Sequence, residues 1–129
     1  MSGWADQPLR DDEVAAQLAA DLDKDDLALI HGAYGADIRL RAGQLRDAVM
    51  AGNADQAYRA AHSLKGASLN LGFLRLGQLS AHLQGLAQAG DMAALAVLWD
   101  GFAGVCDDTL ALLGDSGLAF VTDSSIVRP

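Results

Sequence analysis

The stretch that decides the fold is GNADQAYRAAHSLKGASLNLG, residues 52–72. Gly52 followed by Asn53 indicates that one helix ends and another begins. Glycine takes the left-handed conformation at helix ends, and asparagine caps the first turn of the next helix. Gln56, three residues after Asn53, resembles the second half of a capping box. The stretch therefore predicts a helix that follows Asn53 and runs to about Gly72.

Similar signals on either side of this stretch predict four more helices. The first follows Asp11-Asp12 and ends near Leu22, and the second runs over residues 24–51 with Asp23 as its cap. The fourth begins after the turn at residues 72–73, and the fifth extends from residue 91 to Gly114. Acidic residues at both early starts suit a helix N-terminus. Short connections make neighbouring helices antiparallel.

The composition also favours helices. The chain has 129 residues, with 25 Ala and 21 Leu against 6 Val, 3 Ile and 2 Thr. Alanine and leucine are strong helix formers, whereas β-branched residues favour strands. We expect an all-α protein, an up-down four-helix bundle with an additional short N-terminal helix. Residues 1–10 are expected to form an extension, residues 11–114 the bundle, and residues 115–129 a loose tail in which Leu118, Phe120 and Val121 are able to pack.

Charge, cysteine count and hydropathy exclude several classes of protein. The net charge is −8, which speaks against nucleic acid as a partner. However, six of the nine basic residues lie between Arg39 and Arg75, a segment of net charge +4 that suits an anion or an acidic partner. One cysteine, Cys106, excludes an intramolecular disulfide and predicts a buried thiol. There is no apolar run long enough to span a membrane and no signal-peptide core, so we expect a cytoplasmic protein.

His62 differs from His31 and His82 in its surroundings, because several residues at helical spacing share its face. A nucleophilic imidazole, a cation and a gap beside it suit a phosphoryl group, although a plain surface histidine is the alternative. Neither His31 nor His82 has ligand spacing with other residues, so no metal site is predicted. The residues on the face of His62 are Tyr58, Arg59, Lys65, Gly66 and Leu69, at positions −4, −3, +3, +4 and +7.

Residues 61–72, AHSLKGASLNLG, closely resemble the signature AHxLKGxxxNLG of histidine-containing phosphotransfer (HPt) domains. The resemblance covers roughly residues 10–114. It implies a four-helix bundle with an added N-terminal helix. It also implies that the protein relays phosphoryl groups between aspartates of receiver domains in a multistep phosphorelay.

The resemblance assigns roles to individual residues. His62 matches the phosphorylated histidine, Lys65 the lysine near the phosphate, and Gly66 the small residue that leaves the histidine open. Gln84, 22 residues after His62, matches a glutamine that holds the imidazole in some members. Attack uses a neutral Nε2, so Nδ1 must carry the proton, and an acceptor on the adjacent helix would fix that tautomer. The alternative for Gln84 is an ordinary polar residue at the edge of the core.

The same resemblance implies the partners, which are receiver domains of hybrid histidine kinases and of response regulators. We expect a monomeric phosphocarrier without autokinase activity and without a cofactor of its own, because the receiver supplies Mg²⁺. Receiver docking is expected to use Arg59 with an apolar rim formed by Leu69, Leu18 and Val14. The alternatives are a receiver-binding scaffold that passes no phosphate, the dimerising helices of a histidine kinase, and a metal or haem bundle. An intact His62, Lys65 and Gly66 argue against the scaffold. The chain lacks the proline expected after a kinase histidine, and it lacks the paired ligands of a metal bundle.

Overall fold

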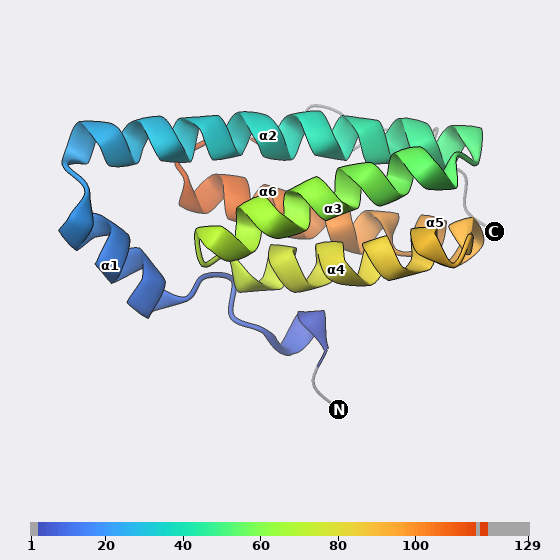
Figure 1. Cartoon of the computed structure of the whole chain (residues 1–129), viewed down its shortest axis with the longest axis horizontal. Helices are drawn as coiled ribbons and strands as arrows, with labels where there is room; N and C mark the ends of the chain where they lie inside the picture. The colour runs from blue at the N-terminus through green and yellow to red at the C-terminus, as the bar shows by residue number, and fades with distance from the viewer. Residues whose placement is uncertain (1–2, 116, 119–129) are drawn as a thin grey trace.

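The computed structural model describes residues 3–115, 117 and 118, and every regular element in these residues is helical (Figure 1). The chain begins with a 3₁₀ turn, and six α-helices follow it. The elements are η1 (Trp4–Asp6), α1 (Asp12–Asp21), α2 (Lys24–Ala51), α3 (Ala54–Asn70), α4 (Leu74–Gln88), α5 (Met92–Val97) and α6 (Trp99–Leu112).

The bundle is formed by α2, α3, α4 and the α5–α6 pair. Helix α3 packs against both α2 and α4, and α6 closes the bundle behind them (Figure 1). Helix α1 leaves one end of the bundle, and every one of its residues keeps part of its surface exposed. The predicted all-α bundle with an extra N-terminal helix is confirmed.

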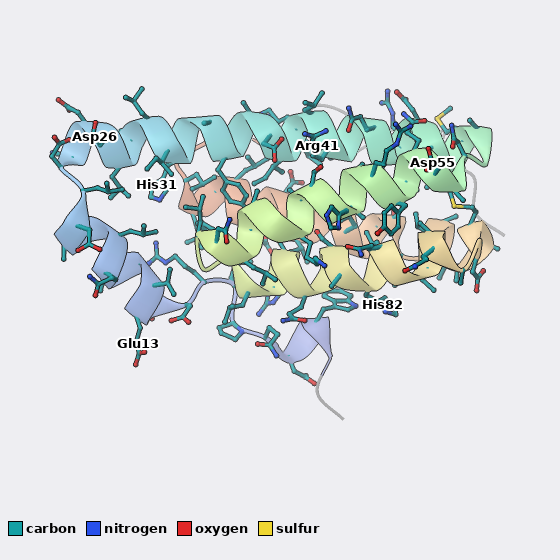
Figure 2. The ribbon with its side chains drawn as sticks, in the orientation of Figure 1. Glu13, Asp26, His31, Arg41, Asp55 and His82 are labelled. Carbon is teal, nitrogen blue, oxygen red and sulfur yellow. The ribbon has the colours of Figure 1, made fainter. Side chains whose placement is uncertain are left out.

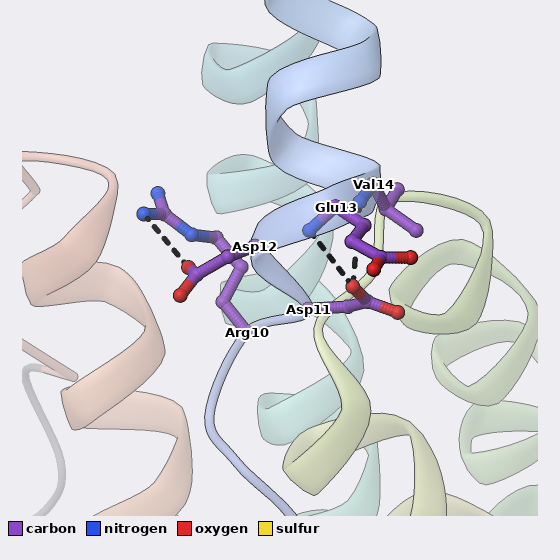
Figure 3. Close-up of polar contacts among 5 residues, drawn as sticks. All are labelled: Arg10, Asp11, Asp12, Glu13 and Val14. Carbon is purple, nitrogen blue, oxygen red and sulfur yellow. Dashed lines mark hydrogen bonds and ion pairs between the residues drawn. The ribbon is translucent and has the colours of Figure 1, made fainter.

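The helix starts lie close to the positions predicted from the sequence. The carboxylate of Asp11 accepts hydrogen bonds from the backbone N–H groups of Glu13 and Val14 at the start of α1 (Figure 3). Gly52 has φ of +66°, and the side chain of Asn53 accepts a hydrogen bond from the N–H of Gln56 at 3.1 Å. These bonds satisfy N–H groups that have no partner inside the helix. As a result, α2 stops and α3 begins where the Gly-Asn pair predicts.

The last helix differs from the prediction, because two helices replace the single one expected. The chain breaks at Leu98, whose N–H donates to the carbonyl of Leu95 three residues back at 3.0 Å. This tighter turn separates α5 from α6, and both Leu95 and Trp99 are buried beside it. No glycine or proline marks position 98, and helical periodicity does not reveal the break.

The core is apolar apart from a few hydroxyl groups that are mostly hydrogen-bonded. The hydroxyl groups of Tyr34 and Ser68 lie 2.7 Å apart between α2 and α3, and Tyr34 stacks on Phe73 with ring centroids 5.0 Å apart. Burial raises the pKa of Tyr34 well above its usual value. Cys106 on α6 is a buried thiol, as predicted, and burial raises its pKa. The contacts of Tyr34 with Ser68 and Phe73 thus join α2 to the helix that carries His62 and to the turn before α4.

The N-terminal segment, predicted as an extension, packs along the bundle. The side chain of Arg75 on α4 donates to the carbonyl of Gln7 at 2.9 Å, and its backbone N–H donates to the carbonyl of Pro8 at 3.2 Å. Trp4 lies against Gly101 of α6, where a Cβ would stand 3.5 Å from its ring. The segment therefore acts as a strap across α4 and α6.

The chain after α6 turns back onto the bundle. Leu118 is buried, and its N–H donates to the carboxylate of Asp107 at 2.7 Å. Arg39 on α2 donates to the carbonyl of Gly117 at 2.9 Å. The expectation that Leu118 packs is confirmed, whereas Phe120 and Val121 lie outside the described residues. In residues 3–115, no helix is both long enough and apolar enough to cross a membrane.

Candidate functional site

His62 lies in the middle of α3 with its side chain exposed, and α4 supplies its hydrogen-bond partner. The Nδ1 atom of His62 is 3.3 Å from Oε1 of Gln84. When Nδ1 carries the proton, it donates to this carbonyl oxygen, and Nε2 keeps the lone pair. The packing of α3 against α4 thus brings together two predicted site residues that are 22 positions apart.

A second ring lies beside the imidazole. Tyr58, one helical turn before His62, is nearly parallel to it, with 10° between the ring planes and 5.9 Å between their centroids. Tyr58 is half-buried and packs against the hydrophobic core. The sequence places Tyr58 on the face of His62 but assigns it no role.

On the opposite side of the imidazole, one turn further along α3, the surface is open. Apart from its two chain neighbours and the adjoining backbone of α3, a Cβ placed on Gly66 would meet no described atom within 4 Å. Packing within the chain therefore does not require glycine at this position, although glycine weakens the middle of a helix. Lys65, the residue before Gly66, is half-buried on the same helix.

A polar groove of roughly 540 Å³ runs between α2 and α3 beside His62. Arg41 on α2 is held in place at its wall, because its guanidinium donates to Asp37 and to Gln44, both at 3.1 Å. Arg59 forms an exposed ion pair with Asp55, also at 3.1 Å. Such an exposed pair contributes little to stability, so the Arg59 side chain is readily available to a partner. The groove is lined by Arg41, Gln44, Asn53, Gln56, Tyr58, Arg59, His62 and Ser63.

The sequence does not identify Arg41 as a site residue, because Arg41 and His62 lie on different helices. The six basic residues of the segment 39–75 do not all line the groove beside His62. Arg39 and Arg75 bond to backbone carbonyls near the two ends of the described chain. Arg41 and Arg59 alone, of the basic residues in this segment, line the groove.

The predicted apolar rim is divided between two places. Leu18 lines a second groove of roughly 440 Å³ between α1 and the bundle, together with Leu71 and Phe73. Val14 is pressed against Gly72, where a Cβ would stand 2.8 Å from the valine Cβ. Leu69 on α3 is 37% exposed, and its side chain lies over Gly77 of α4. None of these three residues lines the groove beside His62.

The other two histidines lie on α2 and α4 (Figure 2). His31 meets the ring of Phe73 edge-on, with ring centroids 6.5 Å apart. His82 is exposed on α4, and it lines a hollow with Trp4 of the strap. Among the described residues, no three His, Cys, Asp or Glu side chains are grouped so that they could hold a metal ion.

Comparison with known proteins agrees with this geometry. Residues 11–115 match the Hpt domain family. The crystal structure of histidine-containing phosphotransfer protein B (HptB) from Pseudomonas aeruginosa PAO1 is similar, with a TM-score of 0.77 and 26% sequence identity. The match covers 83% of this chain and 92% of that one. A comparison with curated proteins returned no significant match. The chain therefore belongs to the Hpt domain family, the histidine-containing phosphotransfer proteins of phosphorelays.

Proposed function

We propose that this phosphorelay protein accepts a phosphoryl group from a receiver-domain aspartate on His62 and passes it to the aspartate of another receiver. The observation that carries this assignment is the exposed imidazole whose Nδ1 faces Gln84 Oε1 at 3.3 Å. With the Nδ1 proton directed into this bond, Nε2 is the nitrogen that attacks phosphorus. A surface histidine without a role would not need an acceptor on a neighbouring helix.

The transfer needs little machinery from this chain. The Nε2 lone pair forms the N–P bond as the bond from phosphorus to the aspartyl oxygen breaks, and the carboxylate leaves with the electron pair. Lys65 supplies a positive charge near the phosphoryl oxygens, and a charge-assisted contact of this kind strengthens as charge develops. The open surface at Gly66 admits the receiver. The chain acts as a phosphocarrier without autokinase activity and without its own cofactor, and the receiver supplies Mg²⁺.

Docking is proposed to use both sides of α3. The groove with Arg41 and Arg59 lies beside His62 and suits the acidic rim of a receiver pocket. The exposed Leu69 and the apolar groove at Leu18 supply contacts further along the bundle. Receivers of hybrid kinases and of response regulators present the same kind of pocket, so one surface serves donor and acceptor. We further expect the carrier to act as a monomer in the cytoplasm, which sedimentation and cell fractionation test.

The test is transfer of label from a receiver charged with radioactive acetyl phosphate. The label on this chain should be acid-labile and base-stable, as expected for phosphohistidine, and it should be absent from His62→Gln. We expect His62→Gln to bind the receiver without taking label. A wild-type chain that binds without taking label would instead support a receiver-binding scaffold.

A further inference from the structure

The two sides of the His62 imidazole differ along the axis of α3. On the N-terminal side stands the ring of Tyr58, nearly parallel to the imidazole at 10°. On the C-terminal side is Gly66, where an added Cβ would meet no described atom within 4 Å apart from its chain neighbours and the adjoining backbone of α3. Side chains on a helix lean toward its N-terminus, so the imidazole leans toward Tyr58 and away from the open surface. A receiver therefore approaches a ring that has an aromatic wall behind it.

Tyr58 is partly anchored by the hydrophobic core and so can serve as that wall. Its side chain is half-buried and packs against the hydrophobic core, and it also borders a hollow with Ala87 and Gln88 of α4. The separation of 5.9 Å between ring centroids is in the range of offset-stacked aromatic pairs. The Gln84 acceptor lies at one edge of the imidazole, whereas the ring of Tyr58 lies nearly parallel to its plane.

We propose that Tyr58 is a positioning residue for phosphotransfer, which fixes the plane of the His62 imidazole and stabilises the phosphorylated ring. This inference rests on the proposed role of His62 as the phosphorylated residue. It concerns the aromatic ring of Tyr58 rather than its hydroxyl group, because the ring faces the imidazole.

The chemistry of phosphoryl transfer to His62 gives the ring of Tyr58 a second role. When Nε2 bonds to phosphorus and the aspartyl carboxylate leaves, the proton stays on Nδ1, in its hydrogen bond to Gln84. The imidazole ring then carries a positive charge, next to the negative phosphoryl oxygens. An aromatic face attracts a cation within about 6 Å of its centroid. At an exposed site this attraction corresponds to about a two- to fivefold shift of the equilibrium toward phosphohistidine.

Two substitutions distinguish the effect of the aromatic ring of Tyr58 from the effects of its hydroxyl group and of its apolar packing. Tyr58→Phe keeps the ring and removes the hydroxyl group, whereas Tyr58→Leu keeps an apolar anchor and removes the ring. The first measurement is ¹⁵N NMR of the unphosphorylated protein, which gives the fraction of His62 protonated on Nδ1. The second is the equilibrium between phosphorylated receiver and phosphorylated carrier. Gln84→Leu is the control that removes the Nδ1 acceptor and should lower the Nδ1–H fraction.

We expect Tyr58→Phe to match the wild type in both measurements. Tyr58→Leu should lower the Nδ1–H fraction and shift the equilibrium toward the receiver by about two- to fivefold. A change in either measurement that appears in Tyr58→Leu but not in Tyr58→Phe supports the proposal. Unchanged values in Tyr58→Leu, or an equal loss in Tyr58→Phe, overturn it. Tyr58→Met replaces Tyr58→Leu if the latter does not fold. The NMR measurement needs no phosphate, so its outcome is independent of whether His62 proves to be the phosphorylated residue.

Discussion

His62 Nδ1 lies 3.3 Å from Gln84 Oε1, so the packing of α4 against α3 determines which nitrogen of the imidazole faces outward. An acceptor is needed at position 84, because a donor there would favour the opposite tautomer. The side-chain carbonyl of glutamine meets this need without placing a full negative charge beside the proposed phosphorylation site.

Gln84→Leu should therefore slow phosphotransfer to His62 by about two- to tenfold, the range that corresponds to one lost hydrogen bond. Gln84→Glu keeps an acceptor and should retain the Nδ1–H tautomer. Rapid-quench transfer assays measure both rates, and thermal unfolding confirms that both variants are folded. Equal rates in wild type and Gln84→Leu would show that the contact does not assist transfer.

Lys65→Ala should slow transfer by about ten- to a hundredfold, because a charge-assisted contact to the phosphoryl oxygens contributes about 1.5–3 kcal/mol. The matched control is Lys24→Ala, which removes a lysine from the start of α2 and should leave the rate unchanged. Single-turnover assays with a phosphorylated receiver measure the rate. If the two alanine variants behave alike, Lys65 has no role at the site.

Gly66→Gln should fold and yet transfer slowly, because the space beside His62 is open in the free protein but needed by the receiver. Gly66→Ala adds one methyl group and should stabilise α3 by up to about 1 kcal/mol. Thermal unfolding and transfer rates are measured on both variants. Wild-type transfer by Gly66→Gln would mean that the receiver does not approach over this position.

Arg59→Glu should lower the rate of association with the receiver and weaken its dependence on salt. The Arg59 side chain is 71% exposed, and contacts of exposed charges are screened within about 8–10 Å at physiological salt. Such charges steer association more than they hold a complex. Surface plasmon resonance at two salt concentrations measures the effect, with Lys24→Glu as the control for the same change of charge. If neither the salt concentration nor Arg59→Glu changes the association rate, Arg59 takes no part in recognition of the receiver.

Tyr34→Phe should lower the free energy of unfolding by about 1–3 kcal/mol, because it leaves the buried hydroxyl of Ser68 without its partner. The double variant Tyr34→Phe/Ser68→Ala removes both hydroxyl groups and should be less destabilised than the sum of the single variants. Denaturant unfolding of the four proteins gives the coupling. Strict additivity would show that the 2.7 Å contact contributes nothing.

The same tyrosine predicts a pH dependence of stability. Burial raises the pKa of Tyr34 above its usual value of 10.0, so the folded protein keeps the proton while the unfolded chain releases it. The stability contributed by this group is present below about pH 10 and falls as the pH rises above that value. Tyr34→Phe lacks this contribution, so its free energy of unfolding should fall less steeply between about pH 9 and 11. If the free energy of unfolding falls equally steeply with pH in wild type and Tyr34→Phe, the hydroxyl group of Tyr34 is not buried.

The sequence predicts those parts of the structure that depend on local signals. The Gly52-Asn53 pair predicts the junction of α2 and α3. The acidic pair Asp11-Asp12 and the cap at Asp23 predict two further helix starts. The break at Leu98 has no glycine, proline or capping residue to mark it. Helical spacing therefore does not reveal it.

In the candidate site, too, the sequence predicts some features and not others. The motif around His62 identifies Lys65 and Gly66, and the family resemblance leads to Gln84. The groove wall at Arg41 belongs to another helix, so no spacing along α3 could predict it. The ring of Tyr58 has the right spacing, but its near-parallel orientation is visible only in the structure.

Transfer of label to His62→Gln tests the central claim most directly. A receiver charged with radioactive acetyl phosphate is mixed with wild type, His62→Gln, His31→Gln and His82→Gln, and the acid-labile label on each chain is measured over time. We predict that His62→Gln stays folded, binds the receiver and takes no label, while the other two substitutions leave labelling close to wild type. Acid-labile label on folded His62→Gln would contradict the assignment of His62 as the residue that carries the phosphoryl group.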